Sequence, residues 1–323
     1  MPGLTRRALT GGLIGLAATR GAAAADWPIR TITIMHGFPP GGPSDVVARI
    51  IADGLSRALG QSVIVESRTG ASGTIAAAQV ARAAPDGYTL LNIPSGHPTA
   101  AVTFAKLPFR PVADFSMITL ASTYSYVMSV PSATGIKSVA ELIEAARRRA
   151  TPLVYGTPGT GSGPHLAIEL FALTTKIKVQ HVPFRGSAPA VTELIAGRLD
   201  FMMDPPATMM QFIRDGRLRA LAVSSAKRYF ALPDTPTLAE AGVPGFDVTG
   251  WQGLIGPAGL PAPIVDRLNR EVTRILLEPA AVEQLHAFGN EPAPCSPDEF
   301  KKRIESDIAK WTGVVEQIHF QKI

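Results

Sequence analysis

The sequence is poor in cysteine and in charged residues, and each shortage excludes a class of protein. Its 323 residues include one cysteine, Cys295, so the chain can form no internal disulfide and no cysteine-based metal cluster. Only 18% of the residues are charged and 46% are hydrophobic, which excludes an intrinsically disordered chain. Beyond the N-terminal segment, no stretch as long as a membrane span is free of charges or helix breakers. The remaining class is a globular protein long enough for two domains.

Residues 1–25 have the pattern of an export signal. Arg6 and Arg7 precede a mildly apolar, glycine-rich run, and an Ala-x-Ala pattern ends at Ala25. The paired arginines resemble those of twin-arginine signals, with the general secretory route as the alternative. We therefore expect cleavage after Ala25 and a periplasmic mature protein that begins near Asp26.

The positive charge is small once this segment is set aside. The whole chain has a formal charge of +5, and three of its cations, Arg6, Arg7 and Arg20, fall in residues 1–25 with no acidic residue among them, which leaves +2. The longest basic run, residues 147–149, closes an expected helix, where cations interact favourably with the helix dipole. We therefore expect no nucleic-acid partner.

Strand-type and helix-type patterns alternate along the chain. Short β-branched runs are each followed by apolar residues at helical spacing. The expected strands are 30–35, 63–65, 88–93, 117–121, 126–130, 153–155, 179–182, 199–203 and 219–224. The expected helices are 46–59, 74–84, 138–149, 164–175, 188–196, 206–214 and a long one capped by Ser296, in a C-terminal part that is mostly helical. This alternation predicts an α/β protein with parallel or mixed sheets flanked by helices.

The alternation restarts after residue 125, which predicts two lobes. Residues 126–225 would form lobe 2, and residues 26–125 and 226–323 would form lobe 1. The chain would then cross between the lobes twice.

Two glycine-rich loops carry the functional signal. One runs from Gly37 to Asp45 and the other from Gly156 to His165, each between an expected strand and an expected helix. Glycine lets the backbone approach a ligand, and the free N–H groups of a helix N-terminus favour an anion. One such loop is as often structural as functional. Two of them, one in each lobe, indicate a site for a small organic anion at the carboxyl ends of the strands.

Enzyme signatures are absent or incomplete. Gly156 and Gly161 have P-loop spacing, but Ser162 stands where the lysine belongs, and no G-x-S-x-G motif exists. Ser162 and His165 are three residues apart, so a hydrolase acting through this pair is the alternative, although no orienting acid is recognisable. No histidine spacing suits a metal site. We therefore expect no catalytic residue, no metal and no cofactor.

The order of motifs along the chain is similar to that of one receptor family. The matching stretches are WPIRTITIMHGFPPGGPSDVVAR, VESRTGASGTIAA, APDGYTLL, LPFRPVADF, YGTPGTGSGPHLAIELF, VPFRGSAPAVTELIAGRLDFMMD, LPDTPTLAEAGVPGF and WQGLIGPAGLPAPIVDRLN. They resemble the solute receptors of tripartite tricarboxylate transporters, the Bug family of periplasmic binding proteins, over essentially the whole mature chain. The resemblance implies a type II, venus-flytrap fold, a carboxylate between the lobes, and the membrane permease of such a transporter as partner. We expect a monomer.

The same resemblance assigns the ligand-binding residues. In lobe 1 they are Phe38, Gly41, Gly42, Ser44, Asp45 and Ser95. In lobe 2 they are Gly159, Thr160, Gly161, Ser162, His165, Phe184, Arg185 and Asp204. The two loops would grip a carboxylate as a pincer. The residues themselves leave alternatives open, because Asp45 also suits the first turn of a helix and Arg185 also suits a solvated loop. The identity of the ligand and a role in transport or in sensing stay open too.

Overall fold

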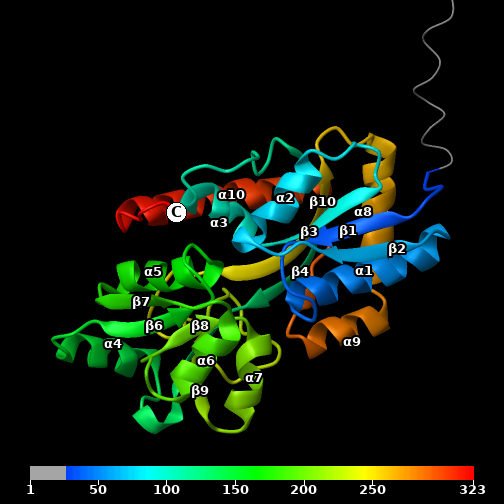
Figure 1. Ribbon diagram of the computed structural model, residues 1–323. Helices are drawn as coiled ribbons and strands as arrows, with labels where there is room; N and C mark the ends of the chain where they lie inside the picture. The colour runs from blue at the N-terminus through cyan, green and yellow to red at the C-terminus, as the bar shows by residue number, and fades with distance from the viewer. Residues whose placement is uncertain (1–26) are drawn as a thin grey trace, which may run out of the picture.

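Strands and the helices that cover them form two lobes in the computed structural model, which describes residues 27–323 (Figure 1). The expected export signal and its cleavage site lie outside this range. Within residues 27–323, no helix is both long enough and apolar enough to cross a membrane.

The strands and helices follow the expected alternation closely. The strands are β1 (Ile32–His36), β2 (Val63–Ser67), β3 (Thr89–Pro94), β4 (Phe115–Ser125), β5 (Val127–Pro131), β6 (Leu153–Thr157), β7 (Val179–Pro183), β8 (Met202–Asp204), β9 (Leu218–Val223), β10 (Thr249–Pro257) and β11 (Glu291–Pro292). The helices are α1 (Pro43–Leu59), α2 (Thr74–Ala81), α3 (Gly96–Thr103), α4 (Val139–Arg148), α5 (Gly163–Thr175), α6 (Ser187–Ile195), α7 (Pro206–Arg214), α8 (Ala262–Leu276), α9 (Pro279–Ala287) and α10 (Pro297–Gln317), with short 3₁₀ turns η2 (Ala71–Gly73) and η3 (Ser132–Thr134).

The first lobe is built on a six-stranded mixed sheet in the order β11-β4-β10-β3-β1-β2. Strand β1 runs parallel to β2 and β3, and β10 runs antiparallel to β3 and β4. Alternate residues of β1 point to opposite faces of the sheet. Ile34 packs with α1 and α8 on one face, and Met35 packs with α2 and α10 on the other. Helices therefore cover both faces of the sheet. A binding site in this lobe would then lie at the carboxyl ends of β1 and β3.

The second lobe combines a three-stranded antiparallel sheet, β8-β5-β9, with the parallel pair β6-β7. A parallel bridge between Tyr155 and Phe201 connects the two sets of strands. Consecutive residues of β8 again serve opposite faces: Met202 packs with α6 and α7, and Met203 packs with α4 and α5. The carboxyl ends of β6, β7 and β8 consequently lie along one edge of this lobe.

The lobes are joined where two chain segments cross. Tyr126 donates its N–H to the hydroxyl of Ser224 (2.9 Å), and the Ser224 N–H donates to the carbonyl of Tyr126 (3.0 Å). The hydroxyl of Ser225 donates to that of Ser125 (2.9 Å), and the hydroxyl of Ser224 donates to the carbonyl of Val248 (2.5 Å). Serine side chains thus hold together three segments that run between the lobes.

The chain after residue 225 contributes to both lobes. Leu238 and Val243 are buried in the same apolar cluster as the residues of α4 and α5. Helix α10 begins against one face of the first sheet, where Phe300 is fully buried, and ends in the core of the second lobe, where Trp311 and Val315 are buried (Figure 1). The predicted boundary between residues 225 and 226 stays a prediction.

Strand β10 is the main element that the sequence did not predict. It lies in the middle of the six-stranded sheet, yet its sequence TGWQGLIGP lacks the β-branched pattern of a strand. Its glycines are explained by packing, because a Cβ at Gly253 would overlap the ring of Phe300 and one at Gly250 would overlap the ring of Tyr124. Helix α3 was also absent from the expected helices.

Candidate functional site

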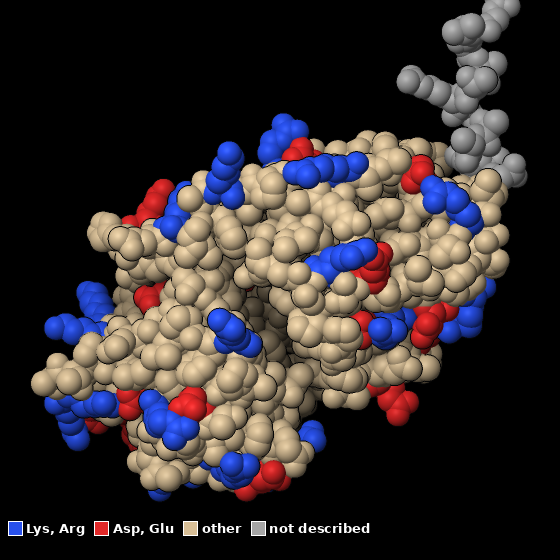
Figure 2. All heavy atoms as spheres, in the orientation of Figure 1, with Lys and Arg blue, Asp and Glu red and all other residues tan. Residues whose placement is uncertain are grey.

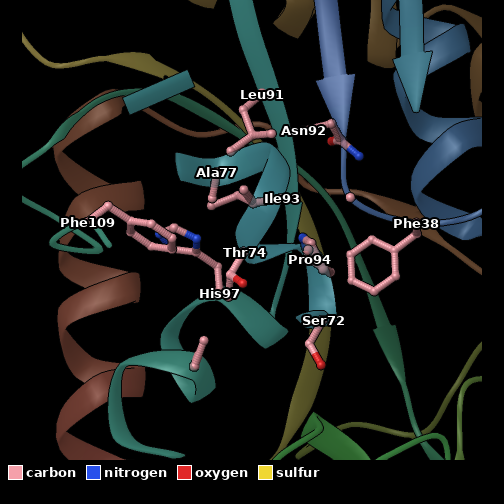
Figure 3. A pocket seen from close by; sticks show the side chains of 13 residues that line it. Phe38, Ser72, Thr74, Ala77, Leu91, Asn92, Ile93, Pro94, His97 and Phe109 are labelled. Carbon is pink, nitrogen blue, oxygen red and sulfur yellow. The ribbon is translucent and has the colours of Figure 1, made fainter. Parts of the chain in front are cut away.

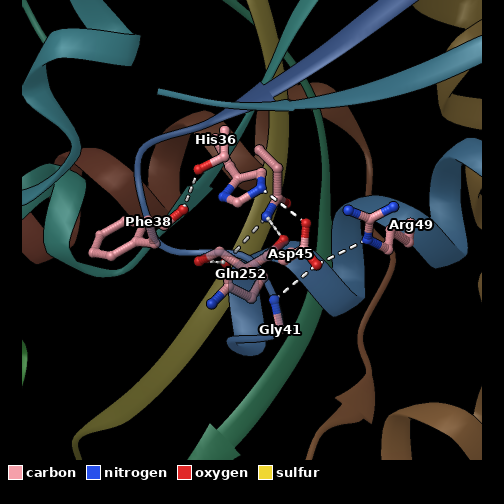
Figure 4. A network of polar contacts seen from close by, with 9 residues as sticks. His36, Phe38, Gly41, Asp45, Arg49 and Gln252 are labelled. Atoms are coloured by element: carbon pink, nitrogen blue, oxygen red, sulfur yellow. Dashed lines mark hydrogen bonds and ion pairs between the residues drawn. The ribbon is translucent and has the colours of Figure 1, made fainter. Parts of the chain in front are cut away.

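The loop after β1 is held in place by one buried carboxylate. Asp45 accepts hydrogen bonds from the N–H of Gly41 (2.9 Å) and from Nε of Arg49 (2.8 Å), and its other oxygen lies 3.1 Å from Nε2 of His36 (Figure 4). Burial alone would raise the pKa of Asp45, but the bonds from Arg49, Gly41 and His36 hold it below its usual value. Both oxygens therefore have partners within the first lobe, and this arrangement favours the helix-turn role of Asp45 over direct ligand contact.

Ser44, at the start of α1, is tied to the sheet beneath it. Its hydroxyl donates to Oε1 of Gln252 (3.1 Å), and its carbonyl accepts from Nδ2 of Asn92 (3.0 Å). Asn92 also donates to Gln252 (3.3 Å), and all three residues are buried. Neither Asn92 nor Gln252 was predicted from the sequence. Asn92 could have been found as a lone amide in an otherwise apolar expected strand, whereas Gln252 lies on the unpredicted β10.

The two glycines predicted in the first-lobe loop differ in backbone conformation. Gly41 is exposed and has φ +79°, a left-handed conformation that favours glycine. Gly42 has φ −82° and ψ 172°, which any residue adopts, and it precedes α1 with no side-chain cap. Phe38 is half-buried, and its carbonyl accepts from the hydroxyl of Ser67 (2.6 Å). The uncapped N–H groups at the start of α1 suit an anion.

Three loops meet along one edge of the second lobe. They follow β6, β7 and β8 and contain most of the predicted second-lobe residues. The N–H of Phe184 donates to the carbonyl of Thr157 (2.9 Å), and the N–H of Gly186 donates to the carbonyl of Pro158 (3.2 Å). Between them, Arg185 is exposed. The structure therefore brings this cation beside the glycine-rich loop.

The second glycine-rich loop touches the first lobe. Gly159 and Gly161 have φ +154° and +75° and flank the half-buried Thr160. A Cβ on Gly161 would lie 2.8 Å from Oγ1 of Thr103, at the end of α3. Glycine is required at position 161 for two reasons, since both the backbone conformation and the close approach of the other lobe exclude a side chain.

Ser162 and His165 form a helix cap. The hydroxyl of Ser162 accepts from the backbone N–H of His165 (3.4 Å), while Nδ1 of the His165 ring accepts from the N–H of Gly161 (2.9 Å). Burial, together with the neighbouring His181, lowers the pKa of His165 to about 3. The imidazole is therefore oriented toward the loop backbone and not toward the serine hydroxyl that a hydrolase would need it to deprotonate.

Asp204 ends β8 and is completely buried. Its Oδ2 accepts from the hydroxyl of Thr208 (2.7 Å), and its Oδ1 has no hydrogen-bond partner in the described part of the chain. Burial raises the pKa of Asp204 to about 7, with Ser187 and Thr208 opposing the shift. The predicted acid is thus a desolvated carboxyl group at the starts of α6 and α7.

Ser95 lies where the two lobes meet. Its hydroxyl is 3.3 Å from that of Tyr126, and its N–H donates to the carbonyl of Trp251 (2.9 Å). A Cβ on Gly163 would overlap the Tyr126 hydroxyl and lie 3.8 Å from Oγ of Ser95. Tyr126, which the sequence did not single out, therefore connects Ser95 of the first lobe with the start of α5.

A small cavity lies beside the first loop, next to Phe38 (Figure 3). Its volume of about 20 Å³ suits roughly one water molecule. His97 lines it, stacks on Phe109 with ring centroids 5.5 Å apart, and bonds the carbonyl of Pro111 (2.9 Å). Burial lowers the pKa of His97 to about 4. His97 is therefore a neutral core residue, and this cavity is too small for an organic acid.

The surface is hollowed between the two lobes (Figure 2). Helix α1 begins at the end of the first lobe that faces the second lobe. Helix α5 begins close to Tyr126, between the lobes (Figure 1). Across residues 27–323, no three His, Cys, Asp or Glu side chains are placed to hold a metal ion. Two α/β lobes, crossing strands and glycine-rich loops at the facing edges together define a two-lobed solute-binding protein.

Comparison with known proteins gives the family. Residues 47–320 match the model of the tripartite tricarboxylate transporter family receptor, and the chain belongs to this family. Protein BugT of Bordetella pertussis is 35% identical over 93% of this chain and 94% of its own length. The chain is therefore a solute receptor of the periplasmic-binding-protein type, and the expected family is confirmed.

Two solved structures confirm the expected fold. The structure titled R. palustris Rpa4515 with adipate has a TM-score of 0.82 and 36% identity, and the match covers 90% of this chain and 98% of that one. MatC from Rhodopseudomonas palustris, with bound malate, has a TM-score of 0.79 and 33% identity, and the match covers 90% and 100% of the two chains.

Proposed function

We propose that this receptor captures a small organic carboxylate between its lobes, outside the cytoplasm, for the membrane subunits of a tripartite transporter. The observation that carries the proposal is the pair of glycine-rich loops, one per lobe, that lead into the starts of α1 and α5. A carboxylate between them would accept from backbone N–H groups and would interact favourably with two helix dipoles. The adipate and malate in the two similar structures support this class of ligand.

The predicted site residues divide into two roles in this proposal. The backbone N–H groups of Gly42 and Thr160 touch the ligand, and the exposed Arg185 supplies a charge-assisted contact. Gly41, Gly159 and Gly161 shape the two loops, because their N–H groups already donate to Asp45, Thr157 and His165. Phe38, Ser95, Phe184 and Asp204 would line the remainder of the site. Ser44, Asp45 and His165 hold the loops, because their polar atoms already have partners within their own lobe.

Lobe closure would follow from ligand binding. The closed state gains contacts from both lobes with the same ligand, so the ligand shifts the population toward closure. The crossing segments held by Ser125 and Ser224 are the place where the backbone would bend. A membrane partner would then distinguish the loaded receptor by its closed shape.

Export and the absence of catalysis are parts of the same proposal. The signal pattern of residues 1–25 supports cleavage after Ala25 and a periplasmic receptor. The cap geometry of Ser162 and His165 supports a binding role over a hydrolytic one. N-terminal sequencing of exported protein tests the first point, and a retained Met1 would contradict it. Turnover of an ester or amide by the mature protein, abolished by Ser162→Ala, would contradict the second.

A thermal-shift screen tests the ligand class. The mature protein is melted alone and with aliphatic and aromatic mono-, di- and tricarboxylates, adipate and malate among them. A ligand at a hundredfold excess over its Kd stabilises the folded state by about 2.7 kcal/mol, which raises the melting temperature measurably. Matched amides and alcohols of the same carbon skeletons serve as controls. Stabilisation by the neutral analogues and by none of the acids would overturn the proposal.

A further inference from the structure

Two stacked histidines lie directly beneath the second glycine-rich loop. The rings of His165, on α5, and His181, on β7, have centroids 3.8 Å apart and planes 15° from parallel. Tyr155 of β6 stacks on His181 at 5.1 Å, and Phe320 approaches His165 at 5.7 Å. The proposed ligand contacts make no use of His181, so the stack needs its own explanation.

Each ring is connected to a different glycine of the loop. Nδ1 of His165 accepts from the N–H of Gly161 (2.9 Å). Nε2 of His181 lies 2.6 Å from Oγ1 of Thr157, and that oxygen accepts from the N–H of Gly159 (3.3 Å). The two bonded glycines are those with positive φ, so the stack holds the backbone at the two positions that give the loop its shape.

We infer that His181 and His165 are a positioning pair, whose hydrogen bonds to the loop set residues 157–161 in the conformation that receives the carboxylate. The inference rests on the proposed function. Nδ1 of His165 can accept from Gly161 only while it carries no proton. A proton there would place two N–H groups against each other and would release the loop.

Burial keeps the pair neutral, and a neighbouring glutamate sets the tautomer of His165. Glu169, one turn along α5, lies 3.9 Å from Nε2 of His165 and accepts from the hydroxyl of Tyr155. This placement favours the tautomer with the proton on Nε2, which leaves Nδ1 free for Gly161. Burial lowers the pKa of His181 to about 4 and raises the pKa of Glu169. The titratable groups that face the stack are thus Tyr155 on β6 and Glu169 on α5, while the segment after α10 contributes the apolar Phe320.

Two substitutions at one position separate the contributions of the stack and the hydrogen bond. His181→Phe keeps an aromatic ring on His165 but loses the bond to Thr157. His181→Gln retains a polar group with a reach similar to that of Nε2 and restores the bond. His286→Gln, on the exposed face of α9, is the matched control. Melting temperatures of all variants identify any that fail to fold.

The first measurement needs no ligand. Amide hydrogen exchange of Gly159 and Gly161 is followed by NMR, together with the imidazole nitrogen shifts of His165. We expect faster exchange at Gly159 in His181→Phe, recovery in His181→Gln, and an unprotonated Nδ1 on His165 in the parent. Equal exchange in the parent and His181→Phe, at equal melting temperature, would overturn the inference.

The second measurement uses adipate as the probe, in calorimetric titrations at neutral pH. We expect His181→Phe to weaken binding about three- to tenfold, the effect of one hydrogen bond, with His181→Gln close to the parent. Equal affinity in the parent and His181→Phe would overturn the inference. If the parent binds no carboxylate at all, the proposed function fails instead, and the exchange measurement still decides whether the pair positions the loop.

Discussion

Tyr126 and Ser224 are joined by two hydrogen bonds at the crossing between the lobes. The N–H of Tyr126 donates to the Ser224 hydroxyl at 2.9 Å, and the N–H of Ser224 donates to the Tyr126 carbonyl at 3.0 Å. Both residues are buried. The same Tyr126 presents its hydroxyl to Ser95, so one residue contacts the crossing, the first lobe and the start of α5.

Ser224→Ala tests the crossing. The substitution leaves the buried N–H of Tyr126 without its side-chain acceptor, which costs about 1–3 kcal/mol of folding free energy. We expect this loss in urea unfolding, with Ser62→Ala, an exposed serine before β2, as the control. Equal unfolding free energies for Ser224→Ala and the parent would show that the serine does not hold the crossing.

The glycines of the two loops should respond differently to alanine. Gly161→Ala places a side chain at φ +75° and 2.8 Å from Oγ1 of Thr103, so we expect a loss of about 1–2 kcal/mol from the backbone alone and a further loss from the contact. Gly42→Ala, at φ −82°, should leave stability near that of the parent. The left-handed requirement thus applies to Gly41 and Gly161 and not to Gly42.

A double substitution separates the two costs at Gly161. Thr103→Gly removes the hydroxyl, the methyl group and the Cβ that a side chain at position 161 would meet, so Gly161→Ala in that background should recover the steric part and retain the backbone part. The measurement is the unfolding free energy of the four proteins in the cycle. Strict additivity would mean that the lobes do not meet at this point.

Asp204→Asn should stabilise the protein more as the pH rises. The pKa of Asp204 is about 7 in the folded protein against an ordinary value of 3.8, so the folded state holds the extra proton between these values. Folding stability from this group therefore falls as the pH rises through that range, and the neutral Asn removes the loss. We expect a larger gain in melting temperature at about pH 8 than at about pH 5. Asp215→Asn, at an exposed position, is the control. An equal gain at both pH values would contradict the raised pKa of the buried Asp204.

Acid should destabilise the protein through its buried histidines. The pKa values of His97 and His165 are about 4 and about 3 in the folded state, against an ordinary value of 6.5. Below pH 6.5 the unfolded chain takes up protons that the folded protein does not, so each group lowers stability by up to about 1.4 kcal/mol per pH unit as the pH falls. Melting curves from neutral pH to about pH 4 test this sign. A flat profile over that range would contradict the neutral state of these rings.

The sequence predicted the loops and most elements, but not the contacts that fix them. The β-branched run of β1 and the helical spacing of α1 are local signals, and both elements were found near their expected positions. Strand β10 was missed because its glycines accommodate rings such as Phe300, a long-range requirement with no local trace. The stack of His165 on His181 likewise depends on two separate elements lying side by side, so the sequence assigned His165 to the glycine-rich loop and gave no role to His181.

The most direct test of the central claim is a crystal structure of the mature protein with the carboxylate that stabilises it most in the thermal-shift screen. The account predicts carboxylate oxygens within about 2.7–3.2 Å of backbone N–H groups from both glycine-rich loops, with the lobes closed on the acid. An acid bound to one lobe only, or with its carboxylate away from residues 41–45 and 159–162, would contradict it.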